Sequence, residues 1–335
     1  MKSVNSIQQN QRTEINEISD IPNNTLLDSN ITSDMKINNE PTGVIIISST
    51  PRSGSTLLGE LLASRNKSIY YFEPLHSKQK SICRKDEKCT QKLFEDLLTC
   101  KIPKSDYGWL LSFFSKYLGE NVQNCLKLDK TRRGSCLKSI DLNKECQTSN
   151  HRILKTIRAR LNVTEYFLKS HNSNIKIIYL SRDPRGAMNS IRKFPWDNSP
   201  NLHCTNILSD IITYEDYSSK YPLKLFWVKY EDLASKPFQT IKGINKFLYN
   251  EESIPNSTIN YINTHMIESS KPEKNSAMNT KKNSRANLEK WRLKIPLKLL
   301  VEINKTINCL SVFEKMGYKN FMYDDVRNVN ISIEI

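Results

Sequence analysis

Residues Val44–Leu58 constrain the fold of this chain more than any other stretch. A β-branched run from Val44 to Ser49 leads into a short turn, and a helix-like run follows at once from Ser55 to Ser64. A strand, a tight turn and a helix start in that order make backbone N–H groups converge at the positive end of a helix dipole. The pattern therefore predicts a buried strand with an anion-binding turn at its carboxyl end.

The residues of the turn itself suit an oxyanion. Gly54 lets the backbone approach a ligand without a Cβ in the way, and Arg52 adds a fixed positive charge. The lysine of a GxxxxGK[ST] loop is absent, which weighs against a Mg²⁺–nucleoside triphosphate site. We expect a phosphate or sulfate group here. The predicted anion-binding residues are Pro51, Arg52, Ser53, Gly54, Ser55 and Thr56.

A second motif, Ile175–Arg192, repeats this layout. A buried-strand pattern runs to Leu180, Arg182 follows at its carboxyl edge, and Pro184 suits the first turn of a helix that carries Ser190. Ligands of open α/β sheets bind beyond the carboxyl ends of the strands. Arg182 and Ser190 are therefore expected to clamp a second anionic group near the first.

Together the two motifs resemble those of the sulfotransferase family, most closely the carbohydrate sulfotransferases that modify sugar 6-hydroxyls. The resemblance covers about residues 44 to 320, and it departs from the family at His76, where tryptophan is usual, and in the long Cys83–Cys146 region. Weaker matches are Tyr71–Leu75 with its glutamate-proline pair, Ile153–Arg158, Val228–Ala234, Lys281–Arg285 and Trp291–Arg292.

The resemblance implies a donor and a way of holding it. The donor is 3′-phosphoadenosine 5′-phosphosulfate (PAPS), with the 51–56 turn on its 5′-phosphosulfate and the Arg182/Ser190 pair on its 3′-phosphate. Lys281, Lys282 and Arg285 would close over the nucleotide, although a solvated charge run is the alternative. The acceptor would be a hydroxyl of a glycan. No metal is expected, because sulfate carries less charge than phosphate and no carboxylate cluster calls for one.

The same resemblance assigns catalytic roles. Glu73 is expected to be the general base, with His76 as the rival, because an unperturbed histidine titrates near neutrality. Lys155 would contact the sulfuryl group and neutralise the leaving oxygen, together with Arg52. Arg158 and Arg160 are candidates for acceptor anions, with solvated surface charge as an equal alternative.

Alternating strand and helix patterns predict an α/β fold with a parallel sheet covered by helices on both faces. The resemblance implies that this is the three-layer P-loop-like sulfotransferase fold, with a central parallel sheet flanked by helices. Strands are expected over Val44–Ser49, Ile69–Phe72, Arg152–Thr156, Ile175–Leu180 and Leu223–Lys229. Helices are expected over Ser55–Ser64, Thr90–Leu98, Tyr107–Leu118, Val163–Ser170, Pro184–Lys193, Ile207–Lys220, Pro237–Leu248 and Pro296–Met316, and Ile267–Asn287 is expected to be a loop. Residues 1–43 are interpreted as a flexible tail or stem, 44–325 as the catalytic domain and 83–146 as a cysteine-rich insertion.

The eight cysteines favour an oxidising compartment. No CxxC pair and no cysteine–histidine zinc spacing occurs, so disulfides are expected, with a local Cys83–Cys89 loop feasible and the pairing otherwise open. Seven Asn-x-Ser/Thr sequons are compatible with a glycoprotein of the secretory pathway. The Golgi lumen follows by resemblance, with the cytoplasm as the alternative. Neither a signal-peptide pattern nor an apolar run of about 20 residues is present, so we expect no membrane anchor within this chain.

A net charge of +15 favours an anionic partner, although a Lys- and Asn-rich composition explains it equally well. No zinc-finger spacing, RRM signature or basic helical repeat is present, so nucleic acid is not expected. Two alternative functions stay open, a P-loop kinase or NTPase and a non-catalytic glycan-binding protein on the same scaffold. The acceptor sugar and the oligomeric state are also open.

Overall fold

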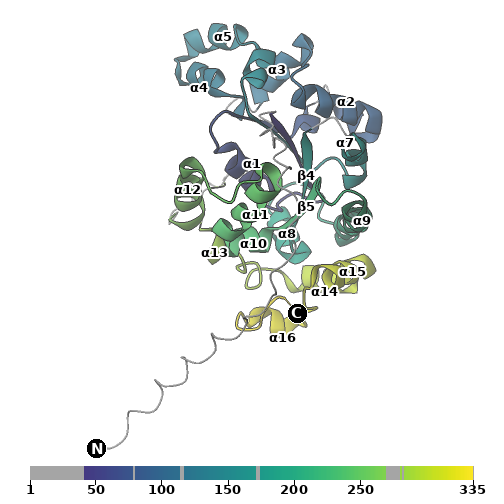
Figure 1. Ribbon diagram of the computed structural model, residues 1–335. Helices are drawn as coiled ribbons and strands as arrows, with labels where there is room; N and C mark the ends of the chain where they lie inside the picture. Colours follow the sequence, from purple (N-terminus) through teal and green to yellow (C-terminus); the bar gives the residue numbers. More distant parts are fainter. Residues whose placement is uncertain are drawn as a thin grey trace, which may run out of the picture. The chain divides into compact units, whose positions relative to one another are not determined.

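The computed structural model describes residues 41–77, 80–113, 117–170, 174–268, 280 and 283–334. Its centre is a five-stranded sheet in the order β2-β3-β1-β4-β5, in which every neighbouring pair is parallel (Figure 1). All five strands were predicted, and each observed boundary lies within two residues of the expected one. The strands are β1 (Thr42–Ser48), β2 (Ser68–Phe72), β3 (His151–Thr156), β4 (Ile175–Ser181) and β5 (Leu225–Lys229).

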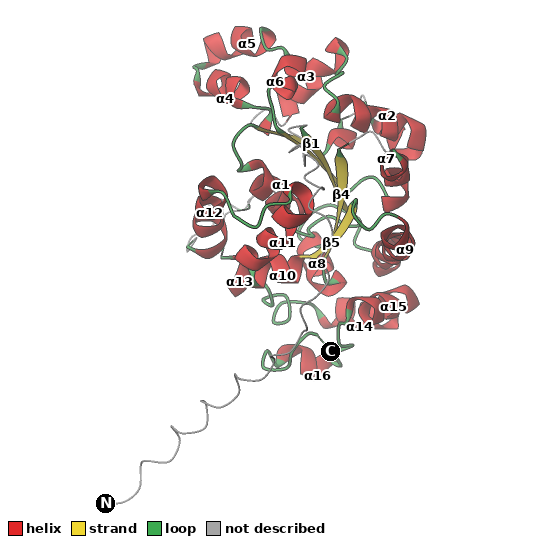
Figure 2. Ribbon diagram, viewed as in Figure 1, coloured by secondary structure: helices red, strands yellow, loops and turns green. Residues whose placement is uncertain are grey.

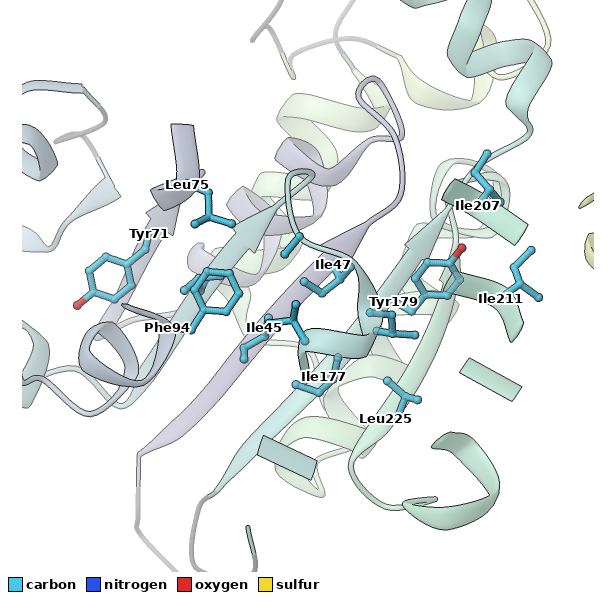
Figure 3. Close-up of a cluster of buried hydrophobic side chains, with 14 of the residues drawn as sticks. Ile45, Ile47, Tyr71, Leu75, Phe94, Ile177, Tyr179, Ile207, Ile211 and Leu225 are labelled. Atoms are coloured by element: carbon cyan, nitrogen blue, oxygen red, sulfur yellow. The ribbon is translucent and has the colours of Figure 1, made fainter. Parts of the chain in front are cut away.

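The sheet is buried on both faces. Along β1, Val44 and Ile46 pack into one hydrophobic cluster while Ile45 and Ile47 pack into another, and none of the four is exposed. Successive strand residues point to opposite faces, so the two clusters lie on the two sides of the sheet. Figure 3 shows the second cluster, with Ile45 and Ile47 beside Tyr179 of the next strand. The apolar run of β1 therefore reflects a strand in the middle of the sheet.

Helices cover both faces and complete a three-layer α/β fold, as expected (Figures 1 and 2). The cluster around Val44 and Ile46 is covered by α1 (Ser55–Ala63), α10 (Tyr230–Ser235), α11 (Pro237–Tyr249) and α12 (Asn256–Ile262). The cluster around Ile45 and Ile47 is covered by α2 (Glu87–Leu98), α7 (Glu165–Lys169), α8 (Pro184–Ile191), α9 (Pro200–Lys220), α14 (Leu297–Lys305) and α15 (Ile307–Met316).

One expected helix is in fact two. The expected helix Pro296–Met316 is broken at Thr306, whose backbone is extended between α14 and α15. The Thr306 hydroxyl donates to the Glu302 carbonyl oxygen at 2.8 Å. A threonine side chain that bonds to the backbone of the preceding turn competes with helix continuation. The amphipathic pattern runs through the break because both helices bury their apolar faces in the same core.

The described part of the region 83–146 is mostly helical, and its helices were only partly predicted. The expected helix Tyr107–Leu118 is observed as α3 (Lys104–Phe113), and three further helices had not been expected. These are α4 (Glu120–Lys127), α5 (Lys130–Lys138) and α6 (Leu142–Gln147). Two short helices lie closer to the C-terminus, α13 (Ser284–Asn287) and α16 (Tyr323–Arg327), and α13 falls in the segment expected to be a loop. Most of the rest of that segment lies outside the described residues.

All eight cysteines are paired, which confirms the expected disulfides and supplies the pairing. Three bridges lie within the 83–146 region. The fourth joins α9 to α15 across 105 positions of sequence and so ties the C-terminal helices to the sheet. The pairs are Cys83–Cys89, Cys100–Cys146, Cys125–Cys136 and Cys204–Cys309.

Across the described residues, no helix is both long enough and apolar enough to cross a membrane.

Candidate functional site

A cavity of about 370 Å³ lies at the carboxyl ends of the strands. It receives residues from the segments that follow all five strands, as the parallel topology requires. Four lining residues are arginines or lysines, and Glu73 supplies a carboxylate. Among the described residues, its lining consists of Pro51, Arg52, Gly54, Ser55, Thr56, Leu57, Phe72, Glu73, His76, Lys155, Ile157, Arg158, Arg182, Trp196, Tyr230 and Thr280.

The turn after β1 has the backbone of an anion loop. Gly54 has φ 92°, and a Cβ there would lie 2.3 Å from Cδ2 of Tyr230, so both conformation and space require glycine. Gly54 is also the N-cap of α1, a helix with no side-chain cap and no acidic residue in its first turn. The positive end of the helix is thus left for a ligand at Ser55 and Thr56, which line the cavity.

Ser53 differs from this expectation. Its side chain is buried, it does not line the cavity, and its Oγ accepts a hydrogen bond from Ser48 Oγ at 2.6 Å. The Ser53 hydroxyl therefore stabilises the loop from behind.

Arg52, Arg182 and Ser190 come together, but in a different arrangement from a two-residue clamp. Arg52 Nε donates to Ser190 Oγ at 3.1 Å, and Arg182 Nη1 donates to the Arg52 carbonyl oxygen at 2.7 Å. Ser190 itself does not line the cavity. Burial, and secondly the charge of Arg182, lowers the pKa of the Arg52 guanidinium. Because both arginines line the same cavity, their two positive charges favour an anion there.

Glu73 lies at the centre of a network of donors. Its Oε1 accepts from Lys155 Nζ at 2.8 Å and from the Ile157 N–H at 3.0 Å, and its Oε2 accepts from Arg158. Both Glu73 and Lys155 are buried, and burial lowers the pKa of the Lys155 ammonium although Glu73 opposes this shift. A carboxylate offers about four acceptor positions, so these three bonds leave room for one more donor.

The rival base, His76, lines the same cavity but is exposed. Partial burial, followed by the charge of Arg158, lowers the pKa of its imidazole, so the ring is largely neutral at pH 7. Neutral imidazole can accept a proton. Both Glu73 and His76 therefore remain candidates for the general base. The Glu73 carboxylate is held in place by hydrogen bonds from Lys155, the Ile157 N–H and Arg158.

Arg160 and Arg285 do not line this cavity. Arg160 does not line the cavity, because its Nη1 donates to the buried Asp210 carboxylate at 2.9 Å and to the Ser49 carbonyl oxygen. Arg285 is exposed on α13 and lines a separate cavity beside Phe238. Lys281 and Lys282 lie outside the described residues.

The site also contains residues that sequence reasoning did not assign to it. Tyr230 follows β5 directly, a position that could have signalled it, and its ring lies 4.3 Å below the Arg182 guanidinium. Phe72 places its ring 4.1 Å from Lys155 Nζ. Trp196 comes from an irregular segment that carried no such signal, and Thr280 also lines the cavity.

A buried carboxylate supports the Arg182 segment from behind. Glu231 Oε1 accepts from the Asp183 N–H at 3.1 Å, and its Oε2 accepts from the Tyr318 hydroxyl at 2.7 Å. Burial, and secondly the neighbouring Asp183 carboxylate, raises the pKa of Glu231 to about 7.

In the parts of the chain that the structure describes, no group of three His, Cys, Asp or Glu side chains is arranged to hold a metal ion.

Comparisons with known proteins identify the family. The model of the sulfotransferase domain family matches residues 43–319. Carbohydrate sulfotransferase 1 of Danio rerio is 24% identical over 86% of this chain and 81% of its own length, and the Homo sapiens protein of that name is 24% identical over 86% and 82%. Among solved structures, the sulfotransferase domain of a Synechococcus PCC 7002 olefin synthase covers 84% of this chain and 96% of its own, with 18% identity and a TM-score of 0.49.

Proposed function

This chain belongs to the sulfotransferase domain family and is a sulfotransferase, and on that premise we propose that it moves the sulfuryl group of PAPS to a hydroxyl of a carbohydrate, with glycan 6-O-sulfation as the favoured reaction. The names of its carbohydrate sulfotransferase relatives support the class of acceptor. The observation that carries the proposal is a single cavity that holds an uncapped helix N-terminus, two adjacent arginines and the Glu73–Lys155 pair.

The residues present fit a donor with two separate anionic groups. We assign the 5′-phosphosulfate to the turn at 51–56, where the α1 N-terminus and Arg52 supply donors. We assign the 3′-phosphate to Arg182, which is held in place by the Arg52 carbonyl and the Tyr230 ring. Ser190 acts through Arg52, whose guanidinium it fixes. The missing loop lysine and the family match both weigh against the kinase or NTPase alternative.

Bound PAPS supplies a sulfuryl group on a phosphate, and transfer breaks the bond between sulfur and the phosphate oxygen as the acceptor oxygen bonds to sulfur. Glu73 takes the proton of the acceptor hydroxyl at its remaining acceptor position. Lys155 stabilises the negative charge that develops on the phosphate oxygen. Because protonation of Glu73 weakens its bond to Lys155, the ammonium becomes available as the leaving oxygen gains charge. Arg158 keeps the Glu73 carboxylate oriented.

The organisation of the chain and its compartment are part of the proposal. We assign residues 44–325 to the catalytic domain, 83–146 to a cysteine-rich insertion and 1–43 to a stem. Four disulfides support an oxidising compartment, and the Golgi lumen is the compartment we infer.

Calorimetry with 3′-phosphoadenosine 5′-phosphate tests the donor site. Arg52→Ala and Arg182→Ala each remove a charge-assisted contact of about 1.5–3 kcal/mol, so affinity should fall about tenfold or more. Arg132→Ala is the matched control, because it removes an exposed arginine of α5 that does not line the cavity, and it should bind as wild type does. Unchanged binding by both cavity variants, or a preference for Mg²⁺–ATP over the phosphoadenosine ligand, would overturn the assignment.

A further inference from the structure

We propose that the indole of Trp196 is the platform on which a sugar ring of the acceptor stacks, which makes Trp196 an acceptor-binding residue of the transfer site. The inference rests on the proposed function, because it assumes that a carbohydrate enters this cavity. The two anion-binding motifs and the Glu73–Lys155 pair do not supply an apolar surface for the acceptor ring, whereas Trp196 does.

Trp196 is an exposed indole in the wall of the cavity. It lies in the segment that follows α8, and 43% of its surface is exposed. Trp109 and Trp291 are buried in the core, and Trp227 is partly buried and donates its indole N–H to Ser181 Oγ. A large aromatic surface left in water at a binding cavity is more informative than a scattered exposed side chain, since it gains free energy when a ligand covers it.

The position of the Trp196 indole is fixed by contacts that lead back to Arg52 of the anion-binding turn. Its ring stacks on Phe194, with centroids 4.8 Å apart and planes 25° from parallel. The Arg52 guanidinium lies 5.1 Å from the centroid of that same Phe194 ring. Because one face of the indole packs on Phe194, its exposed surface belongs to the other face and the edge. The chain of contacts from Arg52 through Phe194 fixes that surface relative to the anion loop.

Tyr230, a second aromatic residue of the cavity wall, serves the donor side. Tyr230 is buried, its ring is covered by Arg182, and it packs against the backbone at Gly54. The two anionic groups of the donor are thus assigned to the inner wall, where Tyr230 lies. Neither anionic group of the donor is assigned to the exposed Trp196, so its indole is available to the acceptor.

The chemistry of a sugar suits this position. A pyranose presents a face of C–H bonds that packs on an indole, and a rim of hydroxyls that needs hydrogen-bond partners. The cavity supplies both, because Trp196 shares it with the polar side chains of His76, Arg158 and Glu73. A ring stacked on Trp196 would be restricted in orientation, which brings one hydroxyl toward the base more often than free diffusion does.

The test compares Trp196→Ala with Trp196→Phe in transfer assays, using N-acetyllactosamine and chondroitin oligosaccharides as acceptors and PAPS as donor. The acceptor KM of Trp196→Ala should rise on the order of tenfold while kcat changes little, the pattern of lost ground-state binding. Trp196→Phe should recover most of the affinity because it keeps an aromatic face. Tyr323→Ala, which removes another exposed aromatic ring from α16 outside the cavity, should leave KM unchanged.

A second readout needs no turnover. With 3′-phosphoadenosine 5′-phosphate bound, titration of the oligosaccharide should shift the tryptophan emission of the wild type, and Trp196→Ala should lack that shift. Transfer by the wild type with an unchanged acceptor KM in Trp196→Ala overturns this inference alone. A tenfold loss of phosphoadenosine affinity in Trp196→Ala also overturns it, since the indole would then contact the nucleotide. No transfer to any glycan by a wild type that binds the nucleotide overturns the proposed function together with the inference.

Discussion

Replacing Glu73 by glutamine separates its two tasks, because the side chain is both the proposed base and the partner of a buried ammonium. The oxygen of the introduced amide can still accept from Lys155 and from the Ile157 N–H. The NH₂ group of that amide would face Arg158 in place of a carboxylate oxygen. Shape is thus kept, while the negative charge and the proton-accepting oxygen are lost.

The cost in stability and the cost in rate can be estimated apart. Breaking a buried ion pair on one side costs about 3–5 kcal/mol, and an amide that keeps two of the three hydrogen bonds should stay at the lower end of that range. For a domain of this size each kcal/mol lowers Tm by about 1.7 °C, so we expect a fall of about 5 °C and a protein that is folded at 25 °C. Loss of general-base catalysis costs about 10²–10⁴ in kcat, or about 3–5 kcal/mol of barrier.

The assay is turnover at saturating donor and acceptor at 25 °C, with calorimetric binding of 3′-phosphoadenosine 5′-phosphate as the measure of folded sites. Glu73→Gln should bind the nucleotide within about threefold of wild type while kcat falls at least about 10²-fold. His76→Ala is the matched control and should keep most of the activity, because His76 lines the same cavity but is exposed. Near-normal turnover in Glu73→Gln with collapse in His76→Ala would refute the assignment and make the histidine the base.

Three further outcomes follow from the structure. Arg160→Ala removes the ion-pair partner of the buried Asp210 carboxylate, so it should lower the free energy of unfolding by about 3–5 kcal/mol in chemical denaturation. The acceptor KM should not rise selectively. A stable variant with a raised acceptor KM would instead support a role for Arg160 in acceptor binding. Replacing both Cys204 and Cys309 by serine should lower the free energy of unfolding by about 5 kcal/mol, because their disulfide closes the longest loop of the four. A decrease of less than about 1 kcal/mol would contradict that estimate. The folded protein holds the Glu231 proton up to a higher pH than the unfolded chain does, so stability should fall by on the order of 3 kcal/mol as pH rises from 4.5, the ordinary pKa of a glutamate, to about 7. Glu231→Gln should flatten that part of the stability profile, and an unchanged slope would show that another group titrates there.

The parts of the fold that sequence reasoning found are those with strong local patterns. The β-branched run of β1 and the turn at Gly54 predict a strand followed by a tight turn into a helix, and the structure has both. The helices of the 83–146 region lacked such a pattern. In α5, for example, no residue is buried, so no hydrophobic period marks it, and disulfides connect this region instead.

The contacts within the site depend on strand neighbours that sequence order does not reveal. Phe72 at the end of β2 pairs with Lys155 of β3, so the next residue, Glu73, meets that lysine. The two arginines of the same segment also have different partners, since Arg158 contacts Glu73 whereas Arg160 contacts Asp210. Residue type and spacing proposed Glu73, Lys155, Arg158 and Arg160, but not Phe72 or Asp210, and the tertiary pairing decided which of them share the cavity.

The most direct test of the proposed function is transfer of ³⁵S from labelled PAPS to a panel of glycans that present galactose, N-acetylglucosamine or N-acetylgalactosamine. We predict label on a 6-hydroxyl of at least one of these sugars with the wild type, and loss of at least about 99% of that rate in Glu73→Gln under the same conditions, which corresponds to the lower limit of about 10²-fold for a general base. Wild-type protein that binds 3′-phosphoadenosine 5′-phosphate but labels no carbohydrate would contradict the account.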